Sequence, residues 1–129
     1  MIKRFVLLLV VLVFAAASAA PANADSTSVT IAKHAVYVSP GQINLELSVH
    51  CTTGFFGVQV QVTQPHAGDG TTFGNGFANG PCEGQSKLVV PVFNNFGPPW
   101  TLGDAAAIAQ LFTPTSPAAD TRDIDVVFQ

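Results

Sequence analysis

The sequence predicts an all-β domain, an antiparallel two-sheet β-sandwich of about seven strands. Apolar and polar residues alternate with a period of two along much of the chain after residue 24, and this alternation is typical of half-buried strands. Clusters of Gly, Pro, Asn and Ser interrupt the alternation, as turns between short strands do. No long segment has the periodicity of a helix.

The first two strands are predicted over residues 28–38 and 43–51. The first is divided into 28–32 and 35–38, with a kink between the two pieces. In 43–51 the odd positions are apolar and the even positions are polar, so this strand directs Cys51 toward the core.

The next three strands are predicted over residues 58–63, 71–78 and 87–93. The first of them carries three valines on one face, and the second is expected to be irregular because it is rich in glycine. The third contains Pro91, which has no N–H to donate to a neighbouring strand. We therefore expect that strand to lie at a sheet edge or to bulge at Pro91.

The last two strands are predicted over residues 103–112 and 124–128. Asp104 could cap a helix, and the alanines after it favour one. The segment is short for a helix and lies between strand-like segments, so we predict a strand. In the final strand, alternation places Asp123 and Asp125 on the face opposite the apolar residues.

The N-terminus has the three parts of a cleavable secretory signal. Lys3 and Arg4 precede an unbroken apolar run of 13 residues, 5–17, and an A-x-A pattern ends at Ala24. The alternative is a membrane anchor, which needs about 20 apolar residues. We therefore predict a signal peptide over residues 1–24 and a secreted, extracellular product.

Cleavage after Ala24 would leave one domain, residues 25–129, whose length suits a single hydrophobic core. This domain has three basic residues, Lys33, Lys87 and Arg122, against eight acidic ones, for a net charge of −5 with histidine neutral. Nucleic acids and anionic membranes attract cationic surfaces. Neither is therefore expected as a partner.

The chain has two cysteines, Cys51 and Cys82. An even pair in an exported protein predicts a disulfide, and closing a loop of this length stabilises a fold by about 3.5–4 kcal/mol. The alternative is a redox or metal-binding pair, but the spacing is far from C-x-x-C and only His50 is near either cysteine.

Several of these features occur together in known secreted proteins. They are the A-x-A signal, the early S-V-T-I strand, the apolar strand ending in Cys51, the V-Q-V-Q-V strand, the Gly-rich stretch before Cys82 and the closing D-I-D-V-V-F strand. In this combination the chain resembles small exported actinobacterial proteins with an immunoglobulin-like β-sandwich. That resemblance implies an immunoglobulin-like fold with a Cys51–Cys82 pair, and no particular activity. A fainter resemblance is to the neocarzinostatin-type apoproteins, which carry a chromophore in a cleft but typically have two disulfides.

The sequence contains no catalytic signature: G-x-S-x-G, H-E-x-x-H and a P-loop are all missing from it. Asp123 and Asp125 could suggest a cation site, but Ca²⁺ needs six to eight oxygen ligands, so we interpret them as solvated charges. The Gly- and Asn-rich stretch 68–84 matches no phosphate-binding motif. Three scattered histidines are interpreted as surface residues: His34, His50 and His66. We expect no enzyme activity, no cofactor and no metal.

Aromatic residues gather in or beside the predicted loops. The candidate binding residues among them are Phe73, Phe77, Phe93, Phe96 and Trp100. Rings next to amide side chains, as in 93–100, could stack on a sugar or anchor a protein partner. The alternative is that these rings fill the open ends of the domain.

The leading functional hypothesis is a non-enzymatic secreted binding module whose partner is an extracellular protein or small ligand. The alternative is a small-ligand carrier with a cleft lined by Phe73, Phe77, Phe93 and Trp100. A third hypothesis is an enzyme inhibitor or a small hydrolase. An inhibitor would use residues 97–100 as its exposed loop.

Overall fold

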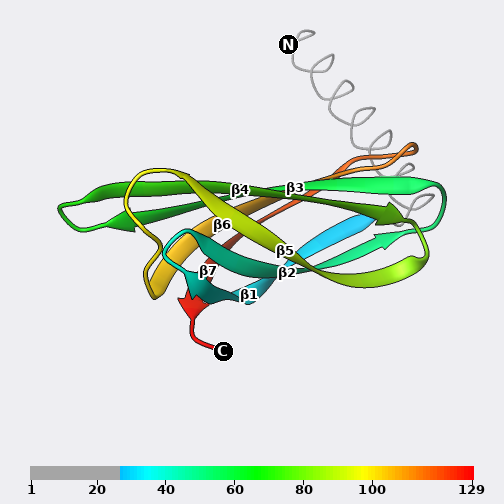
Figure 1. Ribbon diagram of the computed structural model, residues 1–129. Coiled ribbons are helices and arrows are strands. Elements are labelled where there is room, and N and C mark those ends of the chain that lie inside the picture. Colours follow the sequence, from blue (N-terminus) through cyan, green and yellow to red (C-terminus); the bar gives the residue numbers. More distant parts are fainter. Residues whose placement is uncertain (1–26) are drawn as a thin grey trace, which may run out of the picture.

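The computed structural model describes residues 27–129, and within that range it contains seven strands and no helix (Figure 1). The strands are β1 (Ser28–Ser39), β2 (Gln42–Cys51), β3 (Phe55–His66), β4 (Gly70–Pro81), β5 (Gly84–Phe96), β6 (Gly103–Phe112) and β7 (Ala118–Val127). The all-β prediction is confirmed, and residues 103–112 form a strand as predicted. The predicted signal peptide, residues 1–24, lies outside the described residues. From residue 27 onward, no helix is long and apolar enough to cross a membrane.

The strands form one closed barrel in the order β1-β2-β5-β4-β3-β6-β7, with β7 returning to β1. All neighbours are antiparallel except β1 and β7, which are parallel. The prediction of an immunoglobulin-like two-sheet sandwich is therefore wrong. In Figure 1, β3 and β4 run side by side along the length of the molecule, and β2 and β5 run together below them.

Two short pairings close the barrel. β1 shifts register between Ile31 and Ala35, and it then pairs with β7 over only three residues, from His34 to Val36. Ahead of that pairing, the carboxylate of Asp120 on β7 accepts a hydrogen bond from the backbone N–H of Ile31 at 2.8 Å. A side chain thus replaces the missing backbone ladder at the start of this joint.

The second joint brings β4 against β5 from Phe73 to Asn75, with a bulge after Phe73. Glycines permit this approach. A Cβ at Gly76 would overlap the backbone oxygen of Pro91, and one at Gly74 would lie 2.7 Å from the backbone oxygen of Phe93. Pro91 pairs with Asn44 of β2 and has no partner in the short β4–β5 ladder, so β5 lies between two strands and is not at the predicted sheet edge.

The inward-facing side chains fill the barrel interior, as expected for a small barrel. Every strand contributes a fully buried side chain, and the larger ones include Ile31, Ile43, Leu45, Leu47, Val58, Val60, Val62, Val90 and Leu111. The predicted disulfide between Cys51 and Cys82 is present, with their Cα atoms 5.1 Å apart. It joins the end of β2 to the chain just after β4.

Candidate functional site

Four of the five predicted aromatic residues lie on the outside of the barrel. Phe73 and Phe77 project from β4 with exposed fractions of 46% and 61%, and Phe93 and Phe96 project from β5 with 50% and 72%. In β4 the alternate, inward positions are held by Thr72 and small residues. The strand pleat therefore sends the phenylalanines outward.

Trp100 does not share that surface. Its side chain is 1% exposed, and its ring packs over Gly74 inside the barrel. The five predicted residues are thus divided, with four on the outside and one in the core. No common cleft is lined by Phe73, Phe77 and Trp100 together, because the barrel wall separates them.

The phenylalanines stand among neutral amide side chains. We call this surface the aromatic–amide face. Its rings are Phe73, Phe77, Phe93 and Phe96, and its amides are Asn75, Asn79, Asn95, Gln59, Gln61 and Gln110. In the strand register, Phe77 lies opposite Gln59, and Asn75 lies opposite Gln61. β3 and β4 carry no Asp, Glu, Lys or Arg along their whole length.

Contacts within the face hold several of its side chains in place. The Phe73 and Phe96 rings are 6.1 Å apart between centroids and tilted by 51°. The Asn95 amide donates a hydrogen bond to the side-chain oxygen of Asn75. The Phe77 ring lies over Gly57 on β3, where a Cβ would be 3.5 Å from its Cζ atom. These contacts lower the conformational entropy that a partner would have to remove.

The connection from β5 to β6 is held beside this face by partly buried hydrogen bonds. The Gln64 amide donates to the backbone oxygen of Thr101 at 2.8 Å and accepts from its N–H at 3.0 Å. The Thr72 hydroxyl and the Asn94 amide both donate to the backbone oxygen of Pro98, at 2.6 and 2.9 Å. These bonds fix the segment that follows Phe96.

Sequence reasoning missed Gln64, which is only 1% exposed. The signal was present, because Gln64 continues the inward parity of Val58, Val60 and Val62 and is polar where a valine would be expected. A polar residue at a core position needs hydrogen-bond partners. Here those partners are both backbone groups of Thr101.

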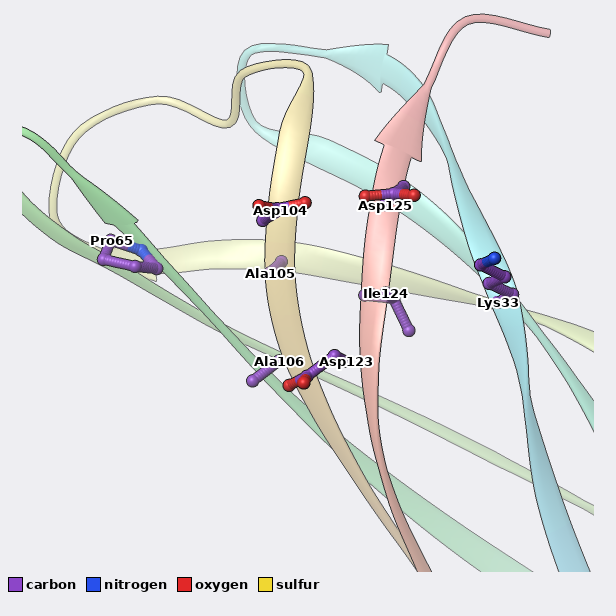
Figure 2. A pocket seen from close by; sticks show the side chains of 8 residues that line it. All are labelled: Lys33, Pro65, Asp104, Ala105, Ala106, Asp123, Ile124 and Asp125. Carbon is purple, nitrogen blue, oxygen red and sulfur yellow. The ribbon is translucent and has the colours of Figure 1, made fainter.

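A hollow of about 460 Å³ is lined by residues of β1, β3, β6 and β7 (Figure 2). Asp104 on β6 lies opposite Asp125 on β7, and Asp123 and Lys33 also line the hollow. A hydrogen bond to Asp125 raises the pKa of Asp104, and the negative charges of Asp125 and Asp123 raise it further. One proton shared by two carboxyls explains the first effect.

These acidic residues do not form a metal centre. Among residues 27–129, no three His, Cys, Asp or Glu side chains are grouped so that they could hold an ion. The three histidines lie on different strands. The Thr72 hydroxyl donates to Pro98, so the Nε2 of His66, 2.6 Å away, must be the donor to that hydroxyl. His66 therefore has a structural partner.

Comparison with known proteins adds no assignment. No protein-family model matches the chain, and no curated protein is similar to it. The function is therefore inferred from the chain's own surfaces.

Proposed function

We propose that this protein is a secreted, non-enzymatic binding module that recognises its partner through the aromatic–amide face. The observation that supports this proposal is the exposure of four phenylalanines on one uncharged surface. Large apolar side chains gathered on a protein surface are typical of interaction sites. The four rings lie on two adjacent strands, and those of Phe73 and Phe96 contact each other.

The energetic basis is the burial of these rings. Covering a fully exposed Phe side chain contributes roughly 1.5–3 kcal/mol. The four rings here are already partly covered, so each would contribute less. Together they offset a large part of the cost of association, and the amides around them would supply the remainder through hydrogen bonds.

Secretion is supported by two independent features. Residues 1–24 have the composition of a signal peptide. The Cys51–Cys82 disulfide is of the kind that persists in oxidising compartments outside the cytosol.

A surface site fits this barrel better than an internal carrier site or an inhibitory loop. Trp100 is buried among core side chains, so the proposed carrier cleft lacks one of its walls. The 97–100 segment is held against the barrel through Pro98 and does not project as an inhibitory loop would.

The test is affinity capture from the producing organism's envelope and medium. The wild type is compared with Phe73→Ser/Phe77→Ser and with Phe128→Ala, a control that removes an exposed ring elsewhere. We expect the wild type and the control to enrich the same material, and the face variant to lose it. Each variant is first shown to unfold at a wild-type urea midpoint. If the face variant retained the same material, the aromatic–amide face would not be the binding site.

A further inference from the structure

We propose that the partner of the aromatic–amide face is a neutral polysaccharide, with sugar rings lying against the phenylalanines and hydroxyl groups bonded to the amides. This inference rests on the proposed function and adds the chemical class of the ligand. It is carried by the alternation of rings and amides on strands that carry no charge.

The first argument is the order of side chains along β4. Its outward positions are Phe73, Asn75, Phe77 and Asn79, a regular sequence of ring, amide, ring, amide. Successive members are about 7 Å apart along a strand. A sugar unit has the matching composition, because its C–H face is apolar and its rim carries hydroxyls.

The second argument is hydrogen-bond chemistry. Each Asn or Gln side chain provides two donors and an acceptor, and a sugar hydroxyl is both donor and acceptor. Gln59 lies beside Phe77 on one strand, and Gln110 on β6 lies beside Gln59 on the next. A row of one ring and two amides therefore crosses β4, β3 and β6. The slightly positive C–H groups of a sugar also suit the negative face of an aromatic ring.

The third argument is charge. Acidic polysaccharides and phosphorylated ligands need cationic partners. The three basic residues of the described chain are on other strands or on a different part of β5: Lys33, Lys87 and Arg122. The face thus offers nothing to neutralise a polyanion, and the acidic charge of the rest of the domain repels one. An uncharged ligand fits.

The fourth argument is length. Phe73 and Phe77 are four residues apart on one strand face, which places their Cα atoms about 13 Å apart. Phe96 lies opposite Phe73 on β5 and widens the surface at that end. One sugar ring cannot cover both ends, so the ligand is a chain of several units. Binding should therefore strengthen with oligosaccharide length until both ends are covered.

The experiment is co-sedimentation of the purified protein with insoluble cellulose, chitin and starch, with affinity electrophoresis in soluble mannan and in alginate as the acidic counterpart. We expect retention by at least one neutral polymer, no retention by alginate and little change when salt is raised. Phe77→Ala and Phe96→Ala should each weaken binding roughly 2- to 10-fold. Gln59→Ala should weaken it too. Phe128→Ala should not.

The results separate this inference from the proposed function. If no neutral polymer is retained while capture from the envelope yields a protein that depends on Phe73 and Phe77, the binding module stands and the polysaccharide is wrong. If sedimentation velocity shows a dimer that Phe77→Ala abolishes, and no polymer binds, the occupant is a second copy and the polysaccharide is again wrong. If a polymer binds equally well to the Phe73→Ser/Phe77→Ser variant, the aromatic–amide face is not the site and both proposals fail.

Discussion

Gly76 lies where β4 approaches β5 so closely that there is no room for a Cβ. A Cβ there would overlap the backbone oxygen of Pro91 and lie 2.8 Å from the Val90 side chain. Backbone cannot rotate away as a flexible side chain can, so any larger residue would push β4 and β5 apart at the point where the barrel closes.

Gly76→Ala is accordingly expected to destabilise the fold by roughly 1–3 kcal/mol. Urea unfolding measures the change, with Gly41→Ala as the matched control, because a Cβ at Gly41 meets nothing within 4 Å. The control should be neutral or slightly stabilising. Equal midpoints for Gly76→Ala and the wild type would contradict the closure described here.

Asp104 gives a prediction for pH. Its pKa is raised above the ordinary 3.8 because it hydrogen-bonds to Asp125 and because Asp125 and Asp123 are negatively charged. The folded state therefore holds the Asp104 proton to higher pH than the unfolded state does. The contribution of this pair to stability is complete below pH 3.8 and falls as the pH rises through the raised pKa.

Asp104→Asn keeps a hydrogen-bond donor toward Asp125 and removes the repulsion between the two carboxylates. We expect the variant to have a higher Tm than the wild type at pH 7 and a smaller difference from it at pH 3. Calorimetry across this range measures the effect. Asp69→Asn, in the turn between β3 and β4, should not raise the Tm in this way. A lower Tm for Asp104→Asn than for the wild type at pH 7 would contradict the repulsion between Asp104 and Asp125.

At the scale of elements, the β5–β6 connection depends on a side chain from β3. Gln64 bonds to both backbone groups of Thr101, and the neighbouring Trp100 N–H donates to the backbone oxygen of Pro40 at 3.0 Å. Strand β3, the β1–β2 turn and the β5–β6 connection thus meet at this end of the barrel. The β5–β6 connection therefore contributes to the core through Trp100.

Gln64→Leu should cost roughly 1–3 kcal/mol, because it leaves both backbone groups of Thr101 without their partners. The chain has one tryptophan, and it is buried, so its fluorescence reports on this segment. We expect the tryptophan emission of the folded Gln64→Leu variant to lie at longer wavelength than that of the folded wild type. Gln61→Leu, on the outer face of the same strand, should leave the emission unchanged.

The strands were predictable because burial of one face requires apolar and polar residues to alternate along the sequence with a period of two. The parity of 43–51 correctly placed Cys51 inside, and 103–112 proved to be a strand. The closure was not predictable, because a sandwich and a barrel share the same alternation. It depends on three residue pairs between β1 and β7 and on two glycines in β4.

The candidate site was predictable only in part. The phenylalanines of β4 follow strand parity once that segment is known to be regular, so their exposure could have been deduced. Trp100 lies in a connection, where no periodicity tells inside from outside. The exposed partners Asn75 and Gln59 become significant only when the register places them beside the rings.

At the scale of the whole molecule, the disulfide is the longest-range covalent constraint. It closes a loop with a sequence separation of 31, which corresponds to about 3.5–4 kcal/mol out of a typical total of 5–15 kcal/mol. The double variant Cys51→Ala/Cys82→Ala should lose about that much stability in urea unfolding.

A reducing agent should destabilise the wild type and leave the double variant unchanged. The unfolded wild type should contain no titratable thiol before reduction. Two thiols per chain at that stage would mean that the pair is not joined in the protein as purified.

The parallel pairing of β1 with β7 sets an order of events in folding. These are the first and last strands, so His34 cannot meet Asp125 until nearly the entire described chain is available. The hairpins β1–β2, β3–β4 and β6–β7 need only nearby residues and can form early, whereas contacts between distant residues form slowly. A chain that stops before β7 would keep an open edge along β1, with the Ile31 N–H deprived of Asp120. The barrel can therefore close only after β7 is available to pair with β1.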